Sequence, residues 1–209
     1  NYWLGGVCMR GNFISSNTWN ATRVNNTEVQ LPNLNPKEYS LIKSESKNLI
    51  FSYEKFFHCH SVMFIVPHED DEINMAGATI YGAIQEGLEV YVVFLTNGDY
   101  EYTFDVRCNE TYQMAKEIGL PQENIIFLGF GDFIGHEIIY NKSAIITSHA
   151  NHNQTYGADF ASLVMSKPKP YSWNGIVESV IDAILHFKPD TIIATDYDTH
   201  VDHRLCTFT

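Results

Sequence analysis

The fold of this chain is decided by residues 61–98, which read SVMFIVPHEDDEINMAGATIYGAIQEGLEVYVVFLTNG. The stretch begins with Val62–Val66, an apolar run of β-formers that ends at a proline and predicts a buried strand. Residues 70–86 then carry apolar side chains at helical spacing, and Gly87 closes this predicted helix. Val90–Leu95 is a second β-rich run. Strand, helix and strand at this spacing predict a parallel βαβ unit.

The same alternation continues toward the C-terminus. Further helices are predicted at residues 106–118 and 176–187, and further strands at residues 125–128 and 191–195. Because crossovers between parallel strands are right-handed, these elements predict a Rossmann-like, layered α/β fold with a mainly parallel sheet flanked by helices. The stretch Gly129–Ser172 is rich in loop residues, and we expect a hairpin near Ile138 and Ile145.

Residues 1–60 differ from the rest because they show no clear hydrophobic period. They are rich in Asn, Ser and Thr and are interrupted by Pro32 and Pro36. We interpret them as an irregular N-terminal arm with short strands or turns. The domain organisation predicted from the sequence is therefore this arm followed by one α/β domain over residues 61–209.

Composition excludes several classes of protein. The chain has 209 residues with 13 Lys+Arg and 25 Asp+Glu, which gives a net charge of −12 and argues against nucleic-acid binding. No apolar run reaches the roughly 18 residues of a membrane span, so we expect a soluble domain. The four cysteines form no CxxC pair, which argues against a disulfide scaffold or a zinc ribbon. The compartment stays open: cytoplasmic, or extracytoplasmic after removal of an upstream segment.

Two clusters of histidine and carboxylate follow predicted strands. They are His68–Glu72, after the first strand, and His200–His203, shortly after the last. The carboxyl ends of parallel strands share one edge of the sheet, so both clusters can line one crevice. Imidazole and carboxylate together suit Zn²⁺, and three ligands with a fourth position open are typical of a catalytic site. An acidic run alone is more often a solvated helix start, but the joint occurrence favours a metal site.

Spacing within the clusters favours different roles for their members. Adjacent Asp70 and Asp71 cannot point the same way, so one can bind metal while the other faces a water molecule. His200 and His203 share a face if a helix begins there, and Asp202 can hold a histidine tautomer.

These motifs resemble those of one known family. His68–Glu72 resembles an HPDDE motif and His200–His203 an HxDH motif of the PIG-L/LmbE-like zinc deacetylases, with further matches at Leu95–Gly98, Arg107 with Glu110, Phe127–Asp132 and Lys188–Asp190. The resemblance covers about residue 61 to the end. It implies removal of an acetyl group from N-acetylglucosamine-type substrates.

The resemblance also implies roles for individual residues. His68, Asp71 and His203 would bind Zn²⁺, or another divalent transition metal, and Asp70 would be the general base. His200 would assist the oxyanion or protonate the leaving amine.

The resemblance implies three further site residues. Asp202 is counted with the catalytic group, and Arg107 and Asp132 are expected to bind substrate. Glu69 replaces the usual Pro of the motif. The chain ends shortly after the HxDH motif, so we expect the domain to lack its C-terminal elements.

The sequence thus predicts a zinc-dependent amide hydrolase acting on an N-acetylated sugar or glycoconjugate. The alternative is a non-catalytic sugar-binding or interaction domain that retains the fold. Gly129–Gly135 invites a dinucleotide-binding interpretation, but its glycine spacing does not match GxGxxG. The carrier attached to the sugar and the oligomeric state stay open.

Overall fold

The computed structural model describes residues 2–4, 7–9, 24–25, 28–29, 52–157 and 167–209. Residues 53–209 belong to one compact unit, which contains both predicted clusters and is described by itself. Its elements in chain order are α2 (Tyr53–Phe57), β5 (Ser61–Val66), α3 (Asp71–Glu86), β6 (Glu89–Thr96), α4 (Phe104–Ile118), the 3₁₀ turn η1 (Gln122–Asn124), β7 (Ile125–Phe130), α5 (Gly135–Tyr140), α7 (Trp173–Phe187), β8 (Thr191–Ala194) and α8 (Val201–Phe208).

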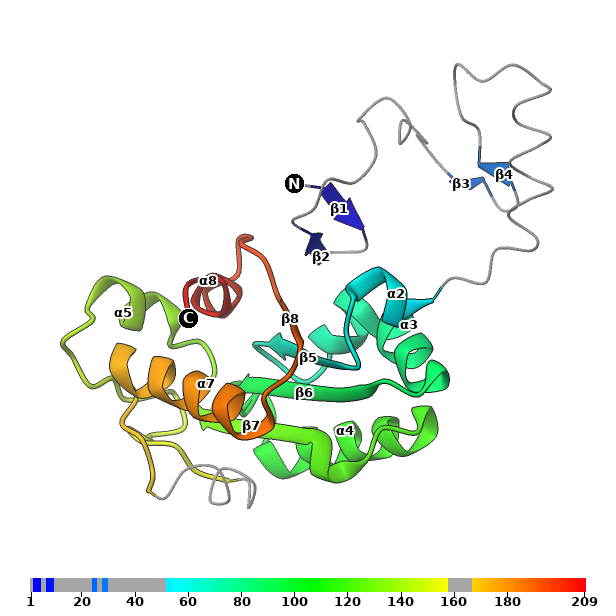
Figure 1. Ribbon diagram of the computed structural model, residues 1–209. Coiled ribbons are helices and arrows are strands. Elements are labelled where there is room, and N and C mark those ends of the chain that lie inside the picture. The colour runs from blue at the N-terminus through cyan, green and yellow to red at the C-terminus, as the bar shows by residue number, and fades with distance from the viewer. Residues whose placement is uncertain (1, 5–6, 10–23, 26–27, 30–51, 158–166) are drawn as a thin grey trace. The chain divides into compact units, whose positions relative to one another are not determined.

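The four strands of this unit form one parallel sheet in the order β7-β6-β5-β8 (Figure 1). The register pairs Val62 of β5 with Val90 of β6 and with Thr191 of β8. Since β5 lies between β6 and β8, the chain reverses its direction of winding at β5. The expected α/β fold with a parallel sheet is therefore confirmed.

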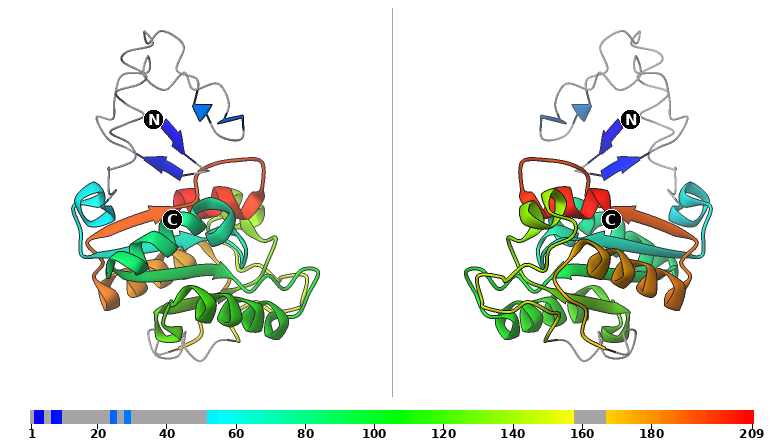
Figure 2. Two further views of the ribbon diagram at one scale, coloured as in Figure 1. Left: turned by 90° about the vertical axis from the view of Figure 1, so that its right-hand side faces the viewer. Right: turned by 90° about the vertical axis from the view of Figure 1, so that its left-hand side faces the viewer.

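Helices cover both faces of the sheet. α7, α8 and α5 share one hydrophobic core with one face, in which Ile138, Val180 and Leu205 pack against the strands. α3 and α4 lie on the opposite face (Figure 2), where Phe104 of α4 packs edge-on against Phe127 of β7. Side chains on both faces are buried, which explains why the strands are continuous apolar runs.

Helix ends follow the sequence signals closely. Gly87 and Gly119 end α3 and α4 in the left-handed conformation, with φ of 91° and 82°, where glycine has no Cβ penalty. Ser172 begins α7, and its hydroxyl accepts a hydrogen bond from the Gly175 amide at 3.1 Å. These local signals explain why predicted and observed boundaries agree to within a few residues.

One local prediction is wrong. The hairpin expected near Ile138 and Ile145 does not include Ile138, because Gly135–Tyr140 forms the helix α5. Ile138 is fully buried in the core, and this packing on the sheet outweighs the loop-like composition of the segment. Later in the same stretch, Gln154 and Pro170 form an isolated antiparallel β-bridge.

The N-terminal arm contains four short described strands: β1 (Tyr2–Leu4), β2 (Val7–Met9), β3 (Val24–Asn25) and β4 (Glu28–Val29). β1 pairs with β2, and β3 pairs antiparallel with β4. Most of the predicted arm lies outside the described residues. Its last part includes the helix α2, which the sequence pattern did not indicate. None of the described helices combines the length and the apolar character that crossing a membrane requires.

Candidate functional site

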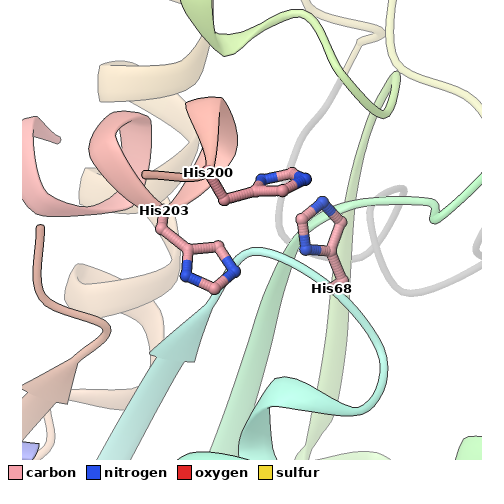
Figure 3. A group of neighbouring side chains, drawn as sticks. All are labelled: His68, His200 and His203. Carbon is pink, nitrogen blue, oxygen red and sulfur yellow. The ribbon is translucent and has the colours of Figure 1, made fainter. Parts of the chain in front are cut away.

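The two predicted clusters meet at the carboxyl end of the sheet. His68 follows β5 directly, and His200 and His203 lie at the start of α8, after β8. Because β5 and β8 are neighbours, residues far apart in sequence come together. The His68 ring lies 4.8 Å from that of His200 and 5.8 Å from that of His203, between centroids. Figure 3 shows the three imidazole rings turned toward a common space.

Asp71 connects two of these histidines. Its Oδ2 lies 3.1 Å from Nδ1 of His68 and 3.3 Å from Nε2 of His203. Burial opposes ionisation of Asp71, but hydrogen bonds from His203 and then His68 outweigh it and lower the pKa of the carboxyl. The three residues proposed as ligands from the resemblance are thus in mutual contact through one carboxylate oxygen.

The second nitrogen of each of these histidines contacts another carboxylate. Nε2 of His68 lies 2.9 Å from Asp132 Oδ1 and 3.2 Å from Asp202 Oδ2, and Asp202 is fully buried. Nδ1 of His203 lies 2.6 Å from Asp198 Oδ2. A carboxylate on the outer nitrogen fixes the tautomer and orientation of a metal-ligating histidine. Nδ1 of His68 and Nε2 of His203, which face Asp71, are therefore the nitrogens that could serve as ligands.

The donor types, two imidazoles and one carboxylate, suit a divalent cation. A tetrahedral Zn²⁺ with bonds of about 2.0–2.1 Å separates its ligand atoms by about 3.3 Å. The contacts of Asp71 Oδ2 with His68 and His203, at 3.1 and 3.3 Å, agree with this spacing. Burial opposes protonation of His68, but the carboxylates of Asp132, Asp202 and Asp71 raise its pKa to about 12. The cluster thus provides strong stabilisation for a positive charge.

Two groups of side chains within the described residues bring three donor atoms within 4.8 Å of one another, and Asp71 belongs to neither. One is His68, His200 and His203, and the other is His68, Asp132 and Asp202. The second group would use Nε2 of His68, but Asp202 Oδ2 and Oδ1 also accept hydrogen bonds from the backbone amides of Phe133 and Gly135, each at 2.8 Å. An oxygen already held by backbone amides is the less available ligand.

Asp70 has different surroundings from its neighbour. As the residue before the first turn of α3, it has a side chain that is 59% exposed, and its Oδ1 lies 3.5 Å from Nη2 of Arg107. Nε of Arg107 also lies 3.5 Å from Oε2 of buried Glu69. Neither Glu69 oxygen has a hydrogen-bond partner among the described residues. Burial raises the pKa of Glu69 to about 7, although Arg107 opposes that shift.

His200 begins α8 and lies on the open side of the cluster. Its Nδ1 accepts a hydrogen bond from the Asp202 amide at 3.3 Å, which caps the helix and fixes the ring. Burial, and then the neighbouring charge of His68, lower the pKa of His200. The predicted pairing of His200 and His203 at a helix start agrees with the structure, since their ring centroids lie 4.9 Å apart.

Two carboxylates in the site belong to neither of the clusters predicted from the sequence. Asp198 contacts His203, and Asp99 accepts hydrogen bonds from the backbone amide of Asp132 at 2.7 Å and from the Tyr156 hydroxyl. The signal that could have found them is their position, since each follows a strand within a few residues. By contrast, His149 and His152, which lie three residues apart in the long loop before α7, do not join the cluster, and His152 stacks on Tyr156 instead.

Comparison with known proteins agrees with the resemblance inferred from the motifs. A family model described as PIG-L, GlcNAc-PI de-N-acetylase, matches residues 63–209. Among solved structures, the chain is similar to N,N'-diacetylchitobiose deacetylase from Pyrococcus horikoshii complexed with its inhibitor MPG, with a TM-score of 0.51 and 21% identity. That alignment covers 85% of this chain and 58% of the other. No match was found among curated proteins.

These two matches carry different weight. The chain spans 58% of the length of the deacetylase, and at 21% identity the likeness shows a shared fold. The family match covers well over half of the chain and includes both the His68–Glu72 and the His200–His203 clusters. The chain therefore belongs to the PIG-L (GlcNAc-PI de-N-acetylase) family.

Proposed function

We propose that the domain over residues 61–209 is an amide hydrolase that removes the acetyl group from an N-acetylglucosamine-type substrate, with Zn²⁺ or another divalent transition metal as cofactor. The observation that carries the proposal is the contact of Asp71 Oδ2 with both His68 Nδ1 and His203 Nε2. Carboxylates on the outer nitrogens of both histidines support it, because they orient the rings as metal ligands require.

His68, Asp71 and His203 would hold the cation. The cation would supply Lewis-acid chemistry, polarising the acetamide carbonyl and making water more acidic. Asp70 is the proposed general base because its carboxylate is exposed beside the ligand Asp71 and can accept the proton of an attacking water. Asp71 cannot share this role while it serves as a ligand.

The remaining proposed roles concern the substrate. His200 is open to the site and stabilises the developing oxyanion or protonates the leaving amine. Asp202 contacts Nε2 of His68 and orients the ring, so Asp202 is a positioning residue. Arg107 lies beside Asp70 at the edge of the site, where its guanidinium can donate to sugar oxygens. Asp132 contacts His68 through Oδ1, and its second oxygen can accept a sugar hydroxyl.

Acetate release by the purified, metal-loaded chain tests this proposal. The panel would contain N-acetylglucosamine, its β-1,4-linked disaccharide, a phosphoinositol-linked N-acetylglucosamine and a simple acetamide, with metal content measured in parallel. We expect about one Zn²⁺ per chain, with metal content greatly reduced in both His68→Ala and His203→Ala. We also expect release from the sugars in preference to the acetamide, because contacts away from the reacting bond position the carbonyl.

The outcomes separate the two functions considered from the sequence. A chain that takes up no divalent metal after reconstitution would exclude metal-dependent catalysis. Equal rates on sugars and on acetamide would exclude sugar recognition. A chain that holds metal and binds the sugars but releases no acetate would favour the non-catalytic sugar-binding domain.

A further inference from the structure

A series of aromatic rings leads away from the histidine cluster. Phe133 contacts the His200 ring edge to face at a centroid distance of 5.4 Å, and its own ring stacks on Tyr100 at 5.0 Å with an interplanar angle of 26°. Tyr100 in turn lies 4.9 Å from the ring of His149. We call Tyr100, Phe133 and His149 the aromatic platform. Its members come from the loops after β6 and β7 and from the long loop before α7.

The platform is open to solvent although its rings are large. Phe133 is 49% exposed and Tyr100 is 44% exposed, and His149 is also exposed. Leaving adjoining aromatic surface in water is unfavourable, and contiguous exposed apolar surface is typical of a binding site. Because the platform touches His200, a ligand on these rings would be continuous with one whose acetamide lies at the histidine cluster.

The backbone of Phe133 is held in a strained conformation. Its φ is +65°, in the left-handed region that favours glycine and is rare for a bulky residue. Two carboxylates hold it there: Asp202 Oδ2 accepts from the Phe133 amide at 2.8 Å, and Asp99 Oδ1 accepts from the Asp132 amide at 2.7 Å. Such strain persists where surrounding contacts fix it, and it concentrates at functional sites. Here the two hydrogen bonds hold the backbone so that the Phe133 ring lies beside His200.

The chemistry of the platform selects its ligand. The face of an aromatic ring carries negative charge density and attracts polarised C–H groups, which the flat faces of a pyranose ring present. A phosphate would instead need cationic side chains, and the platform residues supply none. The guanidinium of Arg107, at the edge of the site, already faces the carboxylates of Glu69 and Asp70. The net charge of −12 also disfavours an anionic ligand.

We propose that Tyr100, Phe133 and His149 form a subsite for an uncharged pyranose ring joined to the acetylated sugar. This inference rests on the proposed deacetylase function, and it names the substrate class as an oligosaccharide of at least two units. The acetylated unit lies at the histidine cluster, and the adjoining unit lies on the platform.

The experiment compares N-acetylglucosamine with its β-1,4-linked disaccharide on the full chain. Saturation-transfer difference NMR on metal-free protein would report which sugar ring contacts aromatic protons without any hydrolysis. Kinetics on zinc-loaded protein would give kcat/KM for both sugars. The variants are Phe133→Gly and Tyr100→Ala, and the control is Tyr140→Ala, an aromatic that is 73% exposed on α5 and lies outside the platform.

We expect saturation transfer to the second sugar ring, and we expect both platform variants to lower kcat/KM for the disaccharide about tenfold, with the monosaccharide changed less than about twofold. Tyr140→Ala should leave both unchanged. Phe133→Gly should unfold at the same temperature as the parent or higher, because glycine adopts φ of +65° without strain. Loss of disaccharide preference in a fully stable variant therefore identifies a binding role.

Other results would overturn the subsite. Equal effects of the platform variants on both sugars, or no transfer to the second ring, would contradict it while leaving the proposed deacetylation intact. A preference for phosphoinositol-linked over β-1,4-linked N-acetylglucosamine would exclude an uncharged ring as the ligand. Saturation transfer that depends on Phe133 in a chain that releases no acetate would support the subsite and contradict the proposed catalysis.

Discussion

At the scale of single residues, Asp70 and Asp71 show how adjacent, identical side chains acquire different chemistry. The Asp71 side chain is 14% exposed and contacts two imidazoles, whereas that of Asp70 is 59% exposed and contacts Arg107. The difference arises at the start of α3, where Asp70 precedes the first helical turn and Asp71 begins it. A ligand and a base can therefore be neighbours in sequence without competing for one position.

Substitution of each aspartate by asparagine should separate the two roles. Asp70→Asn should keep the metal but lower the rate of acetate release by roughly 10²–10⁴-fold, which is the usual value of general-base catalysis. Asp71→Asn should chiefly lose the metal, because the amide supplies no negative charge to the cation. Metal analysis and acetate release on the same preparations would check both. The reverse pattern would exchange the two roles.

Glu69 should make the stability of the fold depend on pH. Burial raises the pKa of its carboxyl from 4.5 to about 7. Because its pKa is higher in the folded state than in the unfolded state, protonated Glu69 contributes to the stability of the fold. This contribution is fully present below pH 4.5 and is lost as the pH rises through 7. Glu69→Gln cannot ionise, so its stability relative to the parent should increase over this interval by roughly 1–3 kcal/mol.

Denaturant unfolding of metal-free protein between pH 4.5 and 8 would measure this difference for Glu69. The control is Glu117→Gln, whose carboxylate is exposed on α4 and should show no such trend. A constant difference between Glu69→Gln and the parent across this interval would contradict the prediction.

At the scale of elements, the contact between α5 and α8 brings the loop after β7 to the proposed metal ligands. A Cβ on Gly135, the first residue of α5, would lie 2.4 Å from the carbonyl oxygen of Val201 and 2.7 Å from Asp202 Oδ1. Only glycine allows this approach without movement of the backbone. The same approach lets the Gly135 amide donate to Asp202, the carboxylate behind His68.

Gly135→Ala should therefore destabilise the domain by about 1–3 kcal/mol, since backbone atoms must move to accept the methyl group. It should also weaken metal binding, because the displaced Asp202 contacts His68. The control is Gly77→Ala on α3, where the nearest atoms to an added Cβ lie at 3.4 Å. That substitution should be neutral or stabilise by roughly 0.5–1 kcal/mol through helix propensity. Similar losses for both variants would argue against a specific contact between α5 and α8.

At the scale of the whole molecule, acidic charge is concentrated in the folded unit around the cluster. Asp71, Asp132, Asp198 and Asp202 all contact the imidazoles, in a chain of net charge −12. Folding brings these carboxylates together, and a bound cation reduces their repulsion. Metal binding should therefore be coupled to the stability of the whole domain.

Removal of metal should lower the unfolding temperature of the chain. A ligand at 100 times its dissociation constant stabilises the native state by about 2.7 kcal/mol, so zinc should give a shift of several degrees over protein in EDTA. His203→Ala should abolish the shift, and His60→Ala, whose ring is 87% exposed, should retain it. Differential scanning calorimetry with zinc and with EDTA would measure this shift in all three proteins. A zinc shift that survives His203→Ala would place the cation elsewhere.

Much of the architecture could be predicted because its signals are local. The apolar runs of β5 and β6 and the glycines after α3 and α4 act within a few residues of the elements that they define. The helix at Gly135–Tyr140 could not be predicted in this way. Its composition is typical of a loop, and it forms a helix because Ile138 is buried in a core built from strands and helices that lie far away in the chain.

The sequence by itself determined the parallel α/β class and the residue types of the site, because hydrophobic period and the His68–Glu72 and His200–His203 motifs are read along the chain. Only the tertiary structure decided which atoms face one another. Placing β8 beside β5 brings His203 to Asp71, and packing α5 against α8 brings buried Asp202 behind His68. Pairing across the sheet depends on how the whole chain packs, so no local spacing could specify which imidazole nitrogens face Asp71.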